Sequence, residues 1–180
     1  MIQKKINKRI VLAGGPSTGK TSVIDELSKL KFKCFDEAAR DILSDYKQKG
    51  LEFKSDPIKI SEEILERRHN DFNKGSILEC KDNVVFYDRG IHEITAYLRS
   101  INQSTSYWDN LPSKYKYDLI FIFQPWKKIY QKDRERTEEF SDLEKISPFI
   151  INIYMESGIK IIEVPNISIK ERVKYILDNR

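Results

Sequence analysis

The sequence has few of the residues that build metal centres and disulfide frameworks. It contains two cysteines, Cys34 and Cys80, and two histidines, His69 and His92. None of them is paired at the spacing of a zinc site, so a structural or catalytic zinc centre is not expected. Two isolated thiols are instead typical of a protein that works in a reducing compartment, and we expect a cytoplasmic location.

Long apolar runs and a strong excess of one charge are also missing. No apolar stretch approaches the roughly 20 residues that a membrane-spanning helix needs, and the first residues lack the apolar core of a signal peptide. The 32 basic and 28 acidic residues leave a net charge of +4, which suits small anionic ligands but gives no strong signal for nucleic acid. The length of 180 residues is typical of a single domain over residues 1–180, of unknown oligomeric state.

The most specific motif is a glycine-rich loop, Gly14-Gly15-Pro16-Ser17-Thr18-Gly19-Lys20-Thr21, which is followed by Ser22. It lies between an apolar run that resembles a buried strand and a segment with helical periodicity, which is the setting of a Walker A phosphate loop. Its glycines let backbone N–H groups approach phosphate oxygens. In such loops Lys20 reaches the β- and γ-phosphates and the Thr21 hydroxyl ligates Mg²⁺. The motif therefore predicts a site for a nucleoside triphosphate with Mg²⁺, bound by Gly14 to Ser22.

Five apolar runs alternate with segments of helical periodicity along the chain. Because the runs are continuously apolar, they indicate parallel strands covered on both faces, and hence a doubly wound α/β fold. The expected strands are Arg9–Ala13, Lys33–Asp36, Val84–Tyr87, Leu119–Phe123 and Ile159–Val164. The expected helices lie near Thr21–Lys31, Glu37–Lys49, Pro57–Asn73, Ile91–Ser100, Lys127–Thr137, Leu143–Ser157 and Ser168–Asp178.

Polar residues follow the predicted strands at the edge where ligands of such sheets bind. Asp88 comes directly after the third strand and could hold Mg²⁺ together with Thr21, while the adjacent Arg89 could grip a phosphate or a substrate oxygen. Asp36 and Glu37 end the second strand, where a carboxylate could accept the proton of an attacking hydroxyl. We favour Glu37 as this base, with Asp36 capping the helix. Alternatively, Asp36, Glu37 and Asp88 could serve only as helix caps.

A region near residues 127–142 has the mixed charge of a lid. Arg134 and Arg136 could close over the nucleotide and neutralise charge on the transferred phosphoryl group. The same residues could instead form structural salt bridges or a solvated helix face. Aromatic residues that could stack on the ring of an acceptor are Tyr97, Tyr107 and Trp108.

Together these motifs resemble the predicted ATPases of the AAA-28 domain family, which is close to the nicotinamide-riboside kinase domain of NadR-type proteins. The resemblance extends from about Lys8 to Leu177 and includes the phosphate loop, Glu37-Ala38-Ala39-Arg40, Asp88-Arg89-Gly90, Pro125-Trp126 and Val164-Pro165. It implies a P-loop NTPase fold like that of nucleoside and adenylate kinases, with the phosphate-loop strand between the third and fourth strands. It also implies ATP as the nucleotide. Relatives often carry an aspartate where this chain has Glu93.

Two functions fit these observations. The first is a magnesium-dependent kinase that transfers the γ-phosphate of ATP to a nucleoside-like hydroxyl, such as that of nicotinamide riboside. The second is a regulatory NTP-binding or hydrolysing module that acts through a protein or lipid partner. The carboxylates Asp36 and Glu37 favour the kinase, because a switch needs no base on the acceptor side.

Overall fold

A computed structural model of the chain describes residues 7–50, 56–130 and 140–180. Within them, one parallel sheet has five strands in the order β2-β3-β1-β4-β5, so the strand that leads into the phosphate loop lies between β3 and β4, as predicted. The strands are β1 Lys8–Ala13, β2 Lys33–Phe35, β3 Val84–Asp88, β4 Leu119–Ile122 and β5 Ile161–Glu163.

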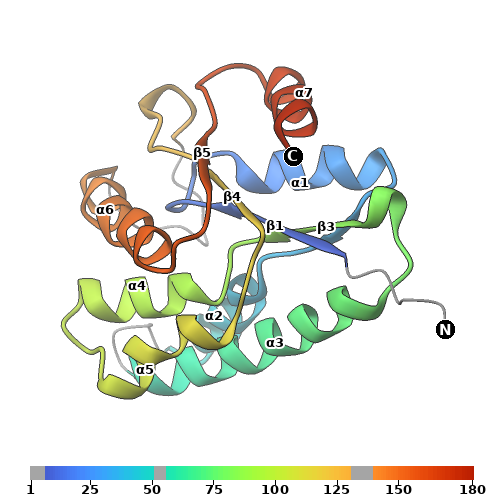
Figure 1. Cartoon of the computed structure of the whole chain (residues 1–180). Helices are drawn as coiled ribbons and strands as arrows, with labels where there is room; N and C mark the ends of the chain where they lie inside the picture. The colour runs from blue at the N-terminus through green and yellow to red at the C-terminus, as the bar shows by residue number, and fades with distance from the viewer. Residues whose placement is uncertain (1–6, 51–55, 131–139) are drawn as a thin grey trace, which may run out of the picture.

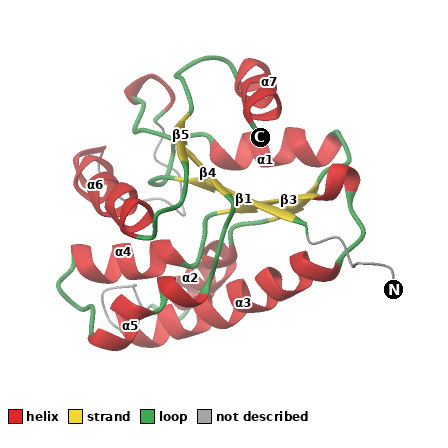
Figure 2. Cartoon of the chain, viewed as in Figure 1, coloured by secondary structure: helices red, strands yellow, loops and turns green. Residues whose placement is uncertain are grey.

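Helices cover both faces of the sheet (Figures 1 and 2). Helices α1 and α7 lie on one face, and α3, α4 and α6 pack on the other. The α-helices are α1 Lys20–Lys29, α2 Ala38–Gln48, α3 Pro57–Ile77, α4 His92–Ser100, α5 Ser106–Asn110, α6 Phe140–Glu156 and α7 Ile169–Asn179. Short 3₁₀ turns are Lys81–Asn83, Pro112–Lys114 and Lys127–Ile129.

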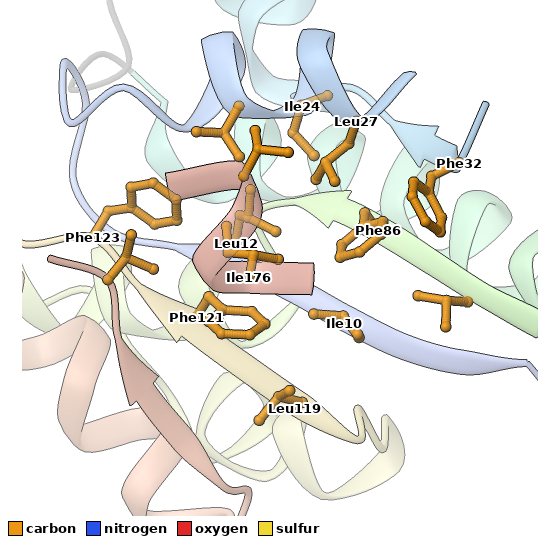
Figure 3. Close-up of a cluster of buried hydrophobic side chains, with 14 residues drawn as sticks. Ile10, Leu12, Ile24, Leu27, Phe32, Phe86, Leu119, Phe121, Phe123 and Ile176 are labelled. Atoms are coloured by element: carbon orange, nitrogen blue, oxygen red, sulfur yellow. The ribbon is translucent and has the colours of Figure 1, made fainter. Parts of the chain in front are cut away.

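Alternate residues of the central strands pack into two separate apolar cores, one on each face of the sheet. Ile10 and Leu12 of β1 point to the side of α1 and α7, where they pack with Ile24 and Ile176 (Figure 3). Their neighbours on β1 point to the opposite face, against α4 and α6. This alternation follows from the pleat of a strand, which sends successive side chains to opposite faces. Burial on both faces fixes β1, and with it the start of the phosphate loop.

A third apolar cluster lies outside the sheet, among α2, α3, α4 and α5. Trp108 of α5 is 3% exposed in this cluster, packed with residues such as Ile64 and Leu98. Trp108 is therefore a core residue and not part of an acceptor pocket, while Tyr107 beside it is exposed. The short helix α5 was not predicted, because five residues are too few to show helical periodicity.

Two predicted elements differ most clearly from the structure. The segment predicted as a helix from Lys127 begins as a 3₁₀ turn, Lys127–Ile129, and Tyr130 has an extended backbone that ends it. The rest of that prediction lies outside the described residues. Helix α3 continues to Ile77, beyond the predicted end at Asn73, because no proline or glycine cap stops it there. Among the described helices, none is long and apolar enough to cross a membrane.

His92 is a polar residue in an apolar place. It is fully buried at the start of α4, stacked on Tyr154 with ring centroids 5.0 Å apart and tilted toward Tyr117 at 5.5 Å. Neither ring nitrogen has a hydrogen-bond partner in the part of the chain that the structure describes. Burial lowers the pKa of His92 to about 4 from its ordinary value of 6.5. The folded protein therefore holds this ring neutral.

We expect His92 to weaken the fold in acid. Below pH 6.5 the unfolded chain binds a proton at this ring that the folded chain does not bind until about pH 4. The free energy of unfolding should therefore be highest above pH 6.5 and fall toward pH 4, by up to about 3 kcal/mol from this group. His92→Phe, which keeps the ring stacking, should flatten that fall in urea titrations between pH 7.5 and pH 4.5. His69→Gln, at an exposed histidine, is the control; an equal pH dependence in His92→Phe and wild type would contradict the expectation.

Candidate active site

The phosphate loop leaves β1 through a conformation that requires glycine at its ends. Gly14 has a φ of 139°, and a side chain there would collide with the backbone oxygen of Phe123. Gly19 has a φ of 88° and precedes the first turn of α1. Both values are unfavourable for residues with a Cβ. The positive end of α1 therefore opens directly onto the loop, as a phosphate site requires.

Lys20 is buried beneath this loop. Its Nζ donates hydrogen bonds to the backbone oxygens of Gly14 and Gly15 at 2.9 and 2.7 Å, and to Thr18 Oγ1 at 3.1 Å. Burial, reinforced by the nearby Arg89, lowers the pKa of Lys20 to about 8. The lysine is thus held inside the loop and close to losing its charge in mildly alkaline solution.

Thr21 and Asp88 meet at the first turn of α1. The Thr21 hydroxyl donates a hydrogen bond to Asp88 Oδ2 at 2.9 Å, and Arg40 of α2 lies 3.3 Å from the same hydroxyl. Asp88 Oδ1 is buried and has no hydrogen-bond partner among the described residues. Burial raises the pKa of Asp88. A free carboxylate oxygen beside a hydroxyl suits Mg²⁺, which binds few protein oxygens and takes its other ligands from phosphates and water. Thr21 and Asp88 would hold the ion.

The two acids after β2 have different surroundings. Asp36 is exposed, whereas Glu37 is turned inward and forms an ion pair with Arg89 through Oε1 and Nε. Burial opposes the charge on Glu37, but Arg89, Lys20 and Arg68 outweigh it and lower its pKa to about 2. Glu37 occupies the N-cap position of α2 without a side-chain capping bond. Of the two acids, Glu37 is therefore the one that neighbouring cations hold in its ionised form beside the phosphate loop.

Arg89 joins three parts of the site. Besides Glu37, its guanidinium donates to the backbone oxygen of Gly14 at 2.9 Å, to Glu93 at 3.0 Å and to Tyr97 Oη at 3.3 Å. Burial alone would lower the pKa of Arg89, but the surrounding carboxylates, Glu37 first, raise it well above its usual value. The arginine is thus permanently charged and bonded to carboxylates on both sides.

Glu93 completes this network from α4. It is fully buried, and besides Arg89 it accepts hydrogen bonds from the backbone N–H of Gly90 at 3.2 Å and from Tyr154 Oη at 3.2 Å. Glu93 thereby holds the chain just after β3. Sequence analysis singled out Glu93 only because relatives often have an aspartate at this position. It gave no sign that Tyr154, on α6 and about sixty residues later, belongs to the same network.

A small pocket opens beside Asp88 and Arg89, between α3 and the ends of β2 and β3. It is lined by Phe35, Asp36, Arg68, Asp71, Tyr87, Asp88, Arg89 and Tyr117. Three of its buried polar atoms have no partner within the described residues: Arg68 Nε, Tyr87 Oη and Asp88 Oδ1. The predicted site residues Arg134 and Arg136 lie outside the described residues, so their roles stay predictions. Ser22 is exposed on the first turn of α1.

A phosphate loop after the central strand of a five-stranded parallel sheet, with a Thr–Asp pair at its end, defines a protein with the P-loop kinase fold. The sequence matches the model of the AAA-28 family, described as an AAA domain, over residues 9–172. The chain therefore belongs to the AAA-28 family. A comparison with curated protein sequences finds no match.

Solved structures share this fold at low sequence identity. Deoxyadenosine kinase from M. mycoides with bound dATP superposes with a TM-score of 0.72 at 16% identity, covering 96% of this chain and 98% of that one. The NadR protein in complex with NR gives 0.73 at 14% identity, and the match covers 96% of this chain but 49% of NadR. Thymidylate kinase from Candida albicans gives 0.69 at 17% identity, with 97% and 91% covered.

The lowered pKa of Lys20 predicts that triphosphate binding takes up a proton. In the free protein Lys20 loses its charge as the pH rises through about 8. Phosphates favour the charged lysine, so affinity should fall above pH 8, at most about tenfold per pH unit for one proton. Calorimetric titration with ATP at pH 8.5 in buffers of different ionisation heat measures the uptake. Lys20→Arg, which cannot lose its proton in this range, should abolish it. A wild-type affinity that is constant from pH 7 to pH 9.5 would rule the effect out.

Proposed function

We propose that the chain is a magnesium-dependent kinase that transfers the γ-phosphate of ATP to the hydroxyl group of a nucleoside-like acceptor. One observation carries the proposal. Arg89 bonds the carboxylate of Glu37 with one edge of its guanidinium and the backbone oxygen of Gly14 with another. The carboxylate of Glu37, partly buried and ionised, is thus fixed beside the phosphate loop, where a bare nucleotide-binding protein would need none.

The donor side consists of the phosphate loop with Lys20, Thr21 and Asp88. Lys20, now bonded to loop carbonyls, can turn its ammonium to the β- and γ-phosphates. Mg²⁺ bound between the phosphates and the Thr21–Asp88 pair would neutralise part of the charge on the transferred group. The preference for ATP over GTP belongs to the proposal and rests on the family resemblance.

On the acceptor side, Glu37 receives a hydrogen bond from the attacking hydroxyl and takes its proton. The hydroxyl oxygen bonds to the γ-phosphorus as the bond from that phosphorus to the β–γ bridging oxygen breaks, and ADP leaves. The pKa of Glu37, about 2, makes it a weak base. That is sufficient in a loose transition state, in which the hydroxyl is little deprotonated until late and positioning contributes more than proton removal. Asp36, one residue earlier, is exposed and belongs to the same proposal only as the second choice.

Charge on the acceptor side favours an uncharged acceptor. Arg89 lies deep in the site, but its ion pairs with Glu37 and Glu93 already compensate its charge. A monophosphate acceptor would bring about two more negative charges to a place that already holds the carboxylates of Glu37 and Glu93. A nucleoside adds none. Nicotinamide riboside is included among the candidates because a structure of NadR holds NR.

A reducing, cytoplasmic setting is part of the proposal. Cys34 and Cys80 are both free cysteines. Burial raises the pKa of the Cys34 thiol to about 11, so it stays protonated and is a poor nucleophile at neutral pH. Neither thiol lies among the residues that form the candidate site.

A panel of acceptors tests the proposal. Labelled ATP and Mg²⁺ are incubated with the protein and, separately, with purine and pyrimidine nucleosides, nicotinamide riboside and the matching monophosphates. We expect phosphate transfer to at least one nucleoside and none to the monophosphates. Transfer only to a monophosphate would contradict the charge argument. Transfer to none of the compounds, together with nucleotide-dependent binding of a protein or lipid partner, would favour the regulatory alternative.

Single substitutions separate the donor and acceptor roles. Glu37→Gln should lower the turnover rate by about 10²-fold or more while ATP affinity changes little, because it removes the base but keeps the loop. Asp88→Asn should weaken Mg-ATP binding whatever the acceptor, because it removes the charged metal ligand. Asp36→Asn is the matched comparison on the exposed neighbour of Glu37. If Asp36→Asn slowed transfer and Glu37→Gln did not, the base would be Asp36.

A further inference from the structure

Arg172, in the first turn of α7, is a buried arginine that contacts the phosphate loop at the backbone oxygen of Thr18. It is 2% exposed. Its guanidinium donates hydrogen bonds to the backbone oxygen of Thr18 at 2.9 Å, to the backbone oxygen of Pro165 at 3.2 Å and to Asn166 Oδ1 at 3.0 Å. The arginine therefore connects the phosphate loop to the loop that follows β5.

All three acceptors of Arg172 are uncharged. No acidic side chain in the described residues forms an ion pair with it, and burial lowers its pKa, although an arginine keeps its proton at any physiological pH. A buried charge without a counter-ion is costly. In this respect it differs from Arg89, whose charge is compensated by Glu37 and Glu93. The uncompensated charge lies next to the segment that would receive the phosphates.

The position of the guanidinium is fixed by aromatic rings and by the loop itself. Its central carbon lies 4.9 Å from the centroid of the Trp126 ring and 5.5 Å from that of Phe123, within range of a cation–π interaction. A Cβ added at Gly19 would approach Arg172 Nη1 to 2.9 Å. Arg172 therefore lies against the glycine that precedes Lys20, and the loops after β4 and β5 both hold it there.

We propose that Arg172 is a positioning residue for triphosphate binding. It holds the Thr18 carbonyl, and hence the turn of the phosphate loop, and its charge is balanced when the phosphates arrive. Because it is shielded from solvent, it acts through the loop and not by touching the nucleotide. The inference rests on the proposed binding of ATP. It assigns to Arg172 an effect that grows with the number of phosphates and does not involve the acceptor.

The test compares Arg172→Gln, Arg172→Lys and wild type in binding ATP, ADP and AMP. Removing a charge-assisted contact should weaken ATP binding by about 10- to 100-fold in Arg172→Gln, less for ADP and least for AMP. Lysine keeps the positive charge but lacks the planar guanidinium that makes the three hydrogen bonds, so Arg172→Lys should bind ATP more tightly than Arg172→Gln and less tightly than wild type. In the kinase reaction KM for ATP should rise while kcat at saturating ATP is retained. Arg99→Gln, which removes ion pairs of α4 with Asp109 and Glu156, is the control.

The outcomes separate the inference from the proposed function. Equal losses for ATP, ADP and AMP, or no loss at all, would overturn the role of Arg172 while leaving ATP binding intact. A wild-type protein that binds no ATP would contradict both. If Arg172→Gln does not fold, as its thermal unfolding would reveal, Arg172→Lys and Trp126→Leu replace it. A raised KM for ATP in either variant supports the inference, and unchanged ATP binding in both overturns it.

Discussion

The buried ion pairs of Arg89 are the interaction on which the candidate site depends. They connect the phosphate loop, the start of α2 and the start of α4 through one guanidinium, by way of Gly14, Glu37 and Glu93. The residue itself has a φ of 75°, a backbone conformation that residues with a Cβ seldom adopt. Breaking such a network leaves buried charges unpaired, which typically costs 3–5 kcal/mol. The arrangement therefore persists only because each charge has its partner.

Local patterns in the sequence predicted the parts of the molecule that are local in the chain. The phosphate loop could be predicted because eight consecutive residues fix its conformation, and the sheet because continuous apolar runs require two covered faces. Asp88 could be placed beside the loop because the ends of neighbouring parallel strands meet at one edge. The central place of β1 between β3 and β4 followed from the pattern of apolar runs together with the family resemblance, and the structure confirms it.

The remaining parts depend on contacts between distant segments. Tyr154 contacts Glu93, 61 residues earlier in the chain, and Arg172 contacts Thr18, 154 residues earlier. Contacts between residues this far apart produce no recognisable motif in the sequence. The 3₁₀ turn at Lys127–Ile129 was predicted as part of a helix because its charged residues have no periodicity that distinguishes the two. Trp108 was interpreted as a possible stacking residue, because the sequence alone does not show whether an aromatic side chain is covered by the core or by a ligand.

The buried cations of the site, Arg89, Lys20 and Arg172, differ in whether they have a counter-ion. The carboxylates of Glu37 and Glu93 compensate the charge of Arg89, and in the proposed reaction this is the side of the acceptor. Lys20 and Arg172, in contrast, are bonded only to neutral oxygens of the loop and of the segment after β5, so their charge is available to an anion. Each of these two cations carries a desolvation cost in the free protein, reflected in the lowered pKa values of both. A bound triphosphate removes that cost. In the proposed function, bound phosphates would supply the counter-charge that Lys20 and Arg172 lack, whereas Arg89 already has its counter-charge in Glu37 and Glu93.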